Sequence, residues 1–141
     1  VKVDGPYGTF SNKIVKNQRQ VWIAGGIGIT PFMAMARSLD DSQDVDLYYL
    51  TKTAKEAVYL DELKTLASKK HNLHVFPFDA EKQGFMTIDY VYKNSNDLDK
   101  ANFMICGPGG MMKAMRSQLK SRSVSKKNIN TEEFNLSWKK L

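Results

Sequence analysis

The residues best suited to chemistry lie in two glycine-containing turns, each of which follows a short apolar run. The first turn is Gly25-Gly26-Ile27-Gly28-Ile29-Thr30-Pro31, and the second is Cys106-Gly107-Pro108-Gly109. Each turn precedes a helical pattern, so free backbone amides at a helix N-terminus would face an anion there. Two strand-turn-helix junctions in one short chain predict an extended nucleotide that lies across the strand ends.

The first turn has features that suit a pyrophosphate. Gly26 and Gly28 allow a tight turn and the close approach of a bulky anion. We expect Thr30 to cap the following helix with its hydroxyl, and Pro31 to occupy the first helical position. The common dehydrogenase fingerprint Gly-x-Gly-x-x-Gly has glycine where this chain has Pro31, so the turn is a different variant.

Cys106 gives the second turn a thiol. Its position before a helix N-terminus favours the thiolate, whereas a buried cysteine that fills a small apolar space is the alternative. It is the only cysteine in the sequence, which excludes an internal disulfide and a multi-cysteine metal site. Nothing near His71 or His74 completes a ligand set, and no metal is expected.

Short apolar runs alternate with helical patterns along the chain, which is typical of parallel strands joined by right-handed crossovers. We therefore predict an α/β fold, a Rossmann-like three-layer domain with a five-stranded parallel sheet flanked by helices. The expected strands are 21–24, 45–50, 73–78, 103–106 and 129–134, the expected helices are 31–39, 60–69, 88–92 and 111–121, and the expected loops are 79–84 and 121–128.

The composition sets the scale of the protein. The 141 residues, of which 42% are hydrophobic, suffice for one domain. No apolar run is long enough to span a bilayer, so we expect a cytoplasmic domain. The sequence begins without Met and reads as a piece of a longer protein. We expect an association with a membrane only if an N-terminal region of that parent carries membrane helices. The domain would then lie at the cytoplasmic face.

The net charge of +6 comes entirely from the last part of the chain, where eight basic residues from 101 onward accompany Glu132 and Glu133. This excess is typical of a solvated helix face, and the alternative is a docking surface for an acidic protein or an anionic lipid. Aromatic residues are not interleaved with the charges, so no nucleic-acid partner is expected.

The end of the second expected strand bears on the choice of nucleotide. NAD-specific Rossmann proteins usually place an acid there. This chain has Thr51 and Lys52, then Lys55, and no acid before Glu56. A hydroxyl and lysines suit a 2′-phosphate, although they could equally be ordinary loop residues. NADP is therefore favoured, with NAD as the alternative.

Four motifs resemble the ferredoxin-NADP reductase family. The stretch from Ala24 to Pro31 resembles its pyrophosphate loop, and Cys106 to Gly109 with Met111 resembles its nicotinamide-side motif. Residues 4–8 resemble the connector from its flavin-binding barrel, and residues 131–134 resemble its terminal strand. The connector and residues 58–63 are most similar to the branch of ferric reductase-like proteins and NADPH oxidases.

The resemblance implies a role for individual residues. Cys106 would position the nicotinamide, with Thr30 as its partner across the ring. Phe134 would cover the flavin ring, and Trp138 is the second candidate for that role. The cofactor contacts implied for the rest of the site are the 2′-phosphate for Thr51 and Lys52, the adenosine for Tyr59, the pyrophosphate for Gly25, Gly26, Ile27, Gly28, Ile29 and Pro31, and the nicotinamide side for Gly107, Pro108, Gly109 and Met111.

The resemblance also implies a domain layout and a reaction. Residues 1–10 would be the connector from a flavin-binding barrel of the same parent chain, and residues 11–141 the NAD(P)-binding domain. The domain would present NADPH for hydride transfer to FAD in the barrel, followed by one-electron transfer to an unknown acceptor. Tyr7, Phe10 and Phe134 would then be exposed where the barrel is lacking. The alternative function is a non-catalytic NAD(P)-binding sensor or regulatory module.

Overall fold

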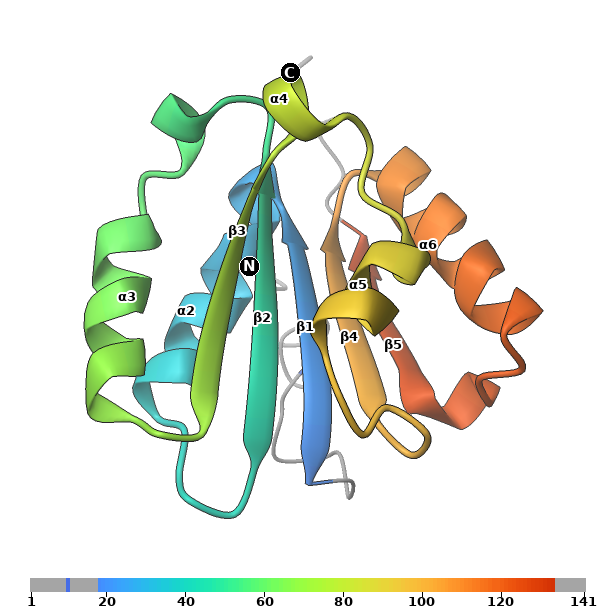
Figure 1. Ribbon diagram of the computed structural model, residues 1–141, viewed down its shortest axis with the longest axis horizontal. Coiled ribbons are helices and arrows are strands. Elements are labelled where there is room, and N and C mark those ends of the chain that lie inside the picture. The colour runs from blue at the N-terminus through green and yellow to red at the C-terminus, as the bar shows by residue number, and fades with distance from the viewer. Residues whose placement is uncertain (1–9, 11–17, 134–141) are drawn as a thin grey trace, which may run out of the picture.

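A five-stranded parallel sheet forms the centre of the protein (Figure 1). The computed structural model describes Phe10 and residues 18–133. The strand order is β3-β2-β1-β4-β5, and every pair of neighbours is parallel. The predicted fold is therefore confirmed. The strands are β1 (Arg19–Gly25), β2 (Asp44–Thr51), β3 (Leu73–Asp79), β4 (Asn102–Gly107) and β5 (Ile129–Glu133).

Helices cover both faces of the sheet. The helices α2 (Thr30–Arg37) and α3 (Leu60–Lys69) pack on one face, and α5 (Ile88–Asn94) and α6 (Gly109–Ser121) pack on the other (Figure 1). The short helical turns are η2 (Gly26–Ile29), η3 (Ala54–Glu56), α4 (Ala80–Gln83) and η4 (Lys126–Asn128).

Two expected loops contain helical turns instead. Residues 79–84 hold the end of β3 and all of α4, because the Asp79 carboxylate accepts a hydrogen bond of 2.9 Å from the Glu81 amide and caps that turn. Residues 121–128 hold the end of α6 and η4. The loop expectation was wrong for 79–84 and holds only for 122–125 of the second segment, because helical turns as short as α4 and η4 leave no apolar periodicity in the sequence.

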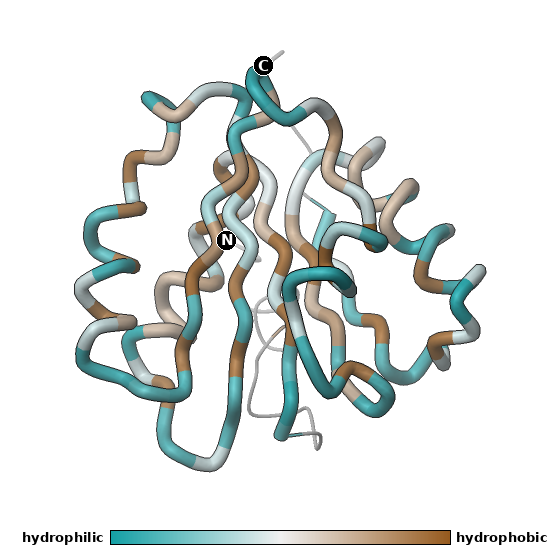
Figure 2. Tube along the Cα trace, viewed as in Figure 1, coloured by the Kyte–Doolittle hydropathy of each residue, from teal (hydrophilic) through white to brown (hydrophobic). Residues whose placement is uncertain are grey.

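Alternation along the strands creates two separate cores. Trp22 and Ala24 of β1 face α2 and α3, whereas Val21 and Ile23 face α5 and α6. All four side chains are fully buried, as the central strand of a doubly covered sheet requires. Hydrophobic residues accordingly follow the strands, while the outer helix surfaces are largely hydrophilic (Figure 2).

Phe10 belongs to the core on the α2 side. Its ring lies 5.5 Å from that of Phe32, which stacks on Trp22 at 5.4 Å. Phe10 is buried, so the expectation that it is exposed was wrong: α2 presents an aromatic surface that covers it. Tyr7, Phe134 and Trp138 lie outside the described residues.

The strand order changes direction between β1 and β4. The chain moves from β1 outward to β2 and β3, and then returns to β4 on the other side of β1. Ala24 pairs with Cys106 at the carboxyl end of this junction. Open α/β sheets bind ligands in the crevice at such a switch point, and both glycine turns emerge there.

Among the described helices, none has both the length and the apolar character that a membrane crossing requires.

Candidate nucleotide-binding site

The two glycine turns pack against each other at the switch point. A Cβ atom on Gly28 would lie only 2.7 Å from the carbonyl carbon of Cys106 and 3.0 Å from the Cα of Gly107. These neighbours are backbone atoms, so they cannot rotate away as a side chain could. Glycine at position 28 is therefore required for contact between the two turns, whereas the sequence alone suggests only the approach of an anion as the reason for this glycine.

The Met111 side chain packs over the contact between the two glycine turns. Its side chain is half-buried on the first turn of α6 and contacts both glycine turns. A Cβ on Gly25 would lie 2.5 Å from the Met111 sulfur, and one on Gly107 would lie 2.6 Å from its terminal methyl carbon. Gly25 and Gly107 thus leave the space that Met111 fills, and its contact with a nucleotide stays a prediction.

Gly26 remains open to a ligand. Its φ of +59° is in the left-handed region, and no atom lies within 4 Å of where its Cβ would be. Gly110, the second residue of α6, has equally open space. An extended anion could therefore approach the backbone at Gly26 and Gly110 without steric hindrance.

Thr30 does not cap α2 as expected. Its hydroxyl donates a 3.1 Å hydrogen bond backward to the carbonyl oxygen of Ile27. The N-cap of α2 is Ile29, and no described side chain caps this helix, in which Pro31 is the second residue. The capping prediction was wrong because η2 already supplies a helical turn before Thr30. The Thr30 amide already donates to the carbonyl oxygen of Ile27 and Pro31 has no N–H, so the helical amides that no side chain caps are those at the start of η2.

Cys106 is a buried thiol. It is 2% exposed and belongs to the core on the α2 side of the sheet. Burial, together with the negative charge of Glu132, raises the pKa of the Cys106 thiol to about 12. Of the two alternatives that the sequence left open, the buried cysteine fits the structure and the thiolate does not. The protonated thiol can still shape the floor of the second turn.

Two carboxyl groups beside the second turn were missed in the sequence. Glu132 pairs in register with Cys106 and is half-buried, and burial raises the pKa of its carboxyl group. Glu133 pairs with Gly107, and its Oε2 lies 2.6 Å from where a Cβ of Gly109 would be. Their position in the last expected strand was the only available signal, because strand neighbours cannot be read from one sequence.

The carboxyl end of β2 provides the opposite end of the candidate site. Thr51 is buried, and its hydroxyl donates to the carbonyl oxygen of Thr53 at 2.7 Å. Lys52 is exposed, and its carbonyl oxygen accepts a 2.9 Å hydrogen bond from the Glu81 amide of α4. The hydroxyl proton of Thr51 is thus donated within the turn. Of the two predicted 2′-phosphate contacts, Lys52 is therefore the one whose charged side chain is exposed.

Tyr59 is placed at this end by Tyr49. The Tyr49 side chain is buried close to the backbone of Val58 and Tyr59, and burial raises the pKa of its phenol. The Tyr59 ring remains 36% exposed. Large exposed apolar side chains of the described chain occur only in turns that follow the first three strands, namely Ile27, Val58, Tyr59 and Phe85.

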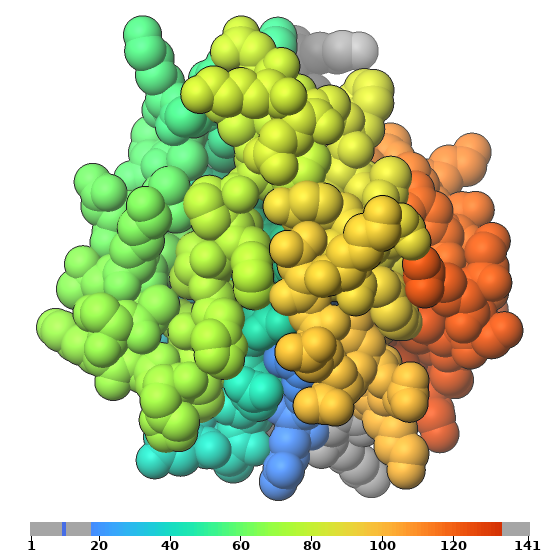
Figure 3. Space-filling view, viewed as in Figure 1, coloured from blue at the N-terminus to red at the C-terminus, as the bar shows by residue number. Residues whose placement is uncertain are grey.

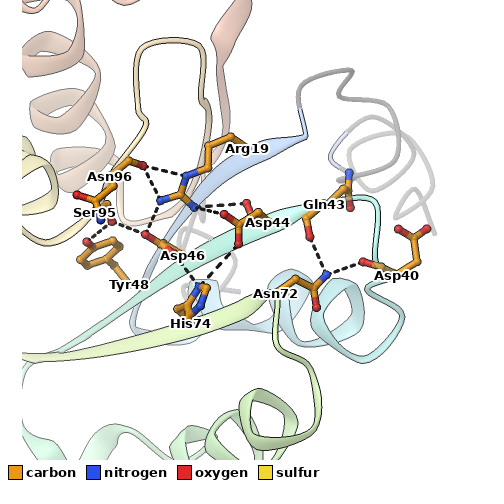
Figure 4. A network of polar contacts seen from close by, with 10 residues as sticks. All are labelled: Arg19, Asp40, Gln43, Asp44, Asp46, Tyr48, Asn72, His74, Ser95 and Asn96. Carbon is orange, nitrogen blue, oxygen red and sulfur yellow. Dashed lines mark hydrogen bonds and ion pairs between the residues drawn. The ribbon is translucent and has the colours of Figure 1, made fainter.

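A second polar cluster occupies the amino end of the sheet (Figure 4). Asp46, which is 5% exposed, accepts hydrogen bonds from Arg19 at 2.7 Å and from Ser95 at 2.5 Å. Its other oxygen lies 3.1 Å from Nδ1 of His74, and Ser95 also bonds Tyr48 at 2.6 Å. Since these groups satisfy one another, the cluster is structural. In the described part of the chain, no group of three or more His, Cys, Asp or Glu residues could hold a metal ion.

Comparison with known proteins identifies the family of the domain. Residues 22–117 match the family model described as the oxidoreductase NAD-binding domain. A flavohemoprotein from Rhodopirellula baltica is 31% identical over 81% of this chain and 31% of its own length. Vanillate O-demethylase oxidoreductase from Pseudomonas putida is 29% identical over 83% of this chain and 36% of its own length.

Solved structures agree on the fold. The flavohemoglobin from Malassezia yamatoensis, determined with bound FAD and heme, superposes with a TM-score of 0.74. It is 25% identical, and the match covers 92% of this chain and 34% of that one. The chain therefore spans about a third of the length of these relatives. It belongs to the oxidoreductase NAD-binding domain family, the nucleotide-binding domain of ferredoxin-NADP reductase-like proteins.

Proposed function

We propose that this chain is the pyridine-nucleotide-binding half of a flavoprotein reductase and that it presents NADPH to FAD held in a separate domain. The observation that carries the proposal is the direct packing of the two glycine turns at the switch point of the sheet. Parallel sheets bind nucleotides at this position, and the family and its reductase relatives support the same chemistry.

The residues of the site fit an extended dinucleotide. The first amides of η2, which no side chain caps, and the open backbone at Gly26 would hold the pyrophosphate, because no side chain blocks the approach there. Thr30 and Cys106 would flank the nicotinamide ring, with Phe134 as the predicted flavin-side cover. When bound, NADPH supplies the hydride, and these residues contribute by orienting the ring.

The adenosine end would select the phosphorylated nucleotide. Lys52 is exposed directly after β2, and no acid ends that strand. A lysine attracts a 2′-phosphate as a point charge, whereas a ribose diol is usually bound by a carboxylate. We therefore propose a preference for NADPH over NADH.

Titration of the chain with NADPH and NADH tests this proposal. Lys52→Glu should weaken NADPH binding about tenfold more than NADH binding, which corresponds to about 1.4 kcal/mol. Lys64→Glu is the matched control, because this exposed lysine lies on α3. Equal losses of affinity for both nucleotides would show that Lys52 does not contact the 2′-phosphate. Failure of the chain to bind either nucleotide would contradict the proposed function.

The remaining proposals concern the parent protein. Residues 1–10 would be the connector from the flavin barrel, and 11–141 the nucleotide domain, at the cytoplasmic face of a membrane if the parent carries membrane helices. Residues 58–63 and the connector support the ferric reductase-like or NADPH oxidase-like branch. A longer protein should oxidise NADPH with FAD and an artificial acceptor. Nucleotide binding without FAD reduction would instead favour the sensor.

A further inference from the structure

One flank of the domain is strongly basic. From Gly109 to Thr131 the sequence contains six Lys and Arg residues and no Asp or Glu. Every one of these six side chains is exposed. They are Lys113, Arg116, Lys120, Arg122, Lys126 and Lys127.

The helix geometry gathers these charges on one side. Lys113, Arg116 and Lys120 follow the spacing i, i+3, i+7 on α6 and therefore share a helix face. Arg116 donates a 3.2 Å hydrogen bond to the hydroxyl of Thr131, so this face is turned toward the edge strand β5. The turn η4 adds Lys126 and Lys127 directly before that strand. In Figure 3, α6 and the segment after it form one continuous flank of the molecule, orange to red.

Most of these charges are not neutralised within the protein. Arg122 forms an ion pair with Asp89 at 2.7 Å and lies 4.1 Å from the centre of the Tyr92 ring. The other five form no ion pair with another described residue, and we refer to them as the basic face. The nearby acids, Glu132 and Glu133, lie beside the second glycine turn.

The composition of the basic face decides between its possible partners. Four of its five residues are lysines, and the large exposed apolar side chains of the described chain all lie elsewhere, at the carboxyl end of the sheet. Protein interfaces are depleted in lysine and rely on aromatic, Met and Arg anchors. Anionic lipid headgroups attract lysines without any fixed geometry. A lipid surface therefore fits the basic face better than an acidic protein.

We propose that the basic face docks this domain on an anionic membrane surface. α6 starts at the second glycine turn and runs back toward the amino end of the sheet (Figure 1). Contact along α6 would therefore orient the strands roughly parallel to the membrane surface. The carboxyl end of the sheet, with both glycine turns, would then remain accessible to a nucleotide from solution. This orientation does not depend on which nucleotide the site takes.

Cosedimentation with vesicles tests the proposal. The chain should bind vesicles of phosphatidylcholine with about one third phosphatidylserine, and binding should be lost in about 0.5 M salt because screening then acts within a few ångströms. The chain should not bind vesicles of pure phosphatidylcholine. Absence of binding to the anionic vesicles at low salt, or equal binding to both kinds, would overturn the proposal.

A matched pair of double variants separates the basic face from net charge. Lys113→Glu with Lys120→Glu should lower partitioning at least about thirtyfold. Lys64→Glu with Lys69→Glu changes the net charge equally on α3, on the opposite side of the sheet, and should have a much smaller effect. Equal losses in the two variants would overturn the proposal.

Two further readouts complete the test. All four positions are exposed, so circular dichroism should show that both variants remain folded, and NADPH affinity should stay unchanged if the site is independent. Polyglutamate serves as the probe for an acidic protein. Tight binding to polyglutamate by a chain that ignores anionic vesicles would identify a protein surface as the partner and overturn the lipid assignment.

Discussion

The two ends of the sheet use polar groups in opposite ways. At the amino end, Arg19, Asp46 and Ser95 bond to one another, and buried polar side chains throughout the described structure have partners. At the carboxyl end, Gly26 and Gly110 leave the backbone open, and η2 begins without a side-chain cap. The amino end thus contributes stability, while the carboxyl end keeps donors free for a ligand.

The amino-end cluster joins segments that are distant in sequence. Arg19 begins β1, Asp46 lies in β2 and His74 lies in β3, while Ser95 belongs to the loop before β4 (Figure 4). Arg19 also donates to the carbonyl oxygen of Asn96 at 3.0 and 2.9 Å, so the loop is fixed by backbone as well as side-chain contacts. This clustering predicts that its loss affects folding and leaves nucleotide affinity unchanged.

Asp46→Ala should have the largest effect on stability. It leaves the Arg19 guanidinium, whose side chain is only 17% exposed, without its buried partner. Loss of one member of a buried pair costs about 3–5 kcal/mol in free energy of unfolding. Chemical denaturation measures this loss, and Asp44→Ala, at the exposed 3.5 Å ion pair, should cost less than about 1 kcal/mol. Similar losses in both variants would show that burial does not govern the cluster.

Gly28→Ala should affect both stability and binding. The added methyl group would overlap the backbone of Cys106 and Gly107, and the two turns would have to separate. We expect a loss of about 1–3 kcal/mol and a strong reduction in NADPH affinity, measured by denaturation and calorimetry. Gly110→Ala is the control, because its site is open, and it should gain roughly 0.5–1 kcal/mol in stability. A harmless Gly28→Ala would contradict the packing of the turns.

The sequence predicted the elements of the carboxyl end better than their contacts. Apolar runs and glycines locate both turns, because strands and turns are encoded in short, continuous stretches of sequence. The contact of Gly28 with Cys106 depends on β1 lying beside β4, which requires the strand order. The hydrogen bond from the Thr30 hydroxyl to the carbonyl oxygen of Ile27 depends on η2, and a helical turn this short leaves no hydrophobic periodicity in the sequence. The amino-end cluster escaped detection because Arg19, Asp46 and Ser95 are isolated polar residues in unrelated segments.

Cys106 provides a pH test of the carboxyl end. Its ordinary pKa is near 9.0, and the folded value is about 12, so the folded state holds its proton more tightly. The stability from this group is complete below pH 9 and is lost as the pH rises toward 12. Between those values wild type should lose about 1.4 kcal/mol per pH unit more than Cys106→Ala, as measured by denaturation at pH 8, 9 and 10. Parallel pH profiles would contradict the buried thiol.

Ser123→Gly should give the smallest change and should stabilise the protein. Ser123 follows the C-terminal end of α6 with φ of 65°, and its amide bonds the carbonyl oxygen of Lys120. Glycine adopts this left-handed conformation without strain, so we expect a gain of roughly 0.5–1 kcal/mol. Thermal unfolding detects the gain, and an unchanged NADPH affinity should accompany it. A lower stability would mean that the Ser123 side chain makes a contact worth more than the strain.

The contact between the glycine turns has a consequence for the thermodynamics of binding. Because Gly28 touches the backbone at Cys106 and Met111 covers Gly25 and Gly107, the separation of the two turns is fixed when the sheet folds. A nucleotide would then bind a preorganised surface, because the entropic cost of ordering these segments is part of folding and not of binding. Changes in affinity between nucleotides should therefore arise at the Lys52 end, where the side chain is free.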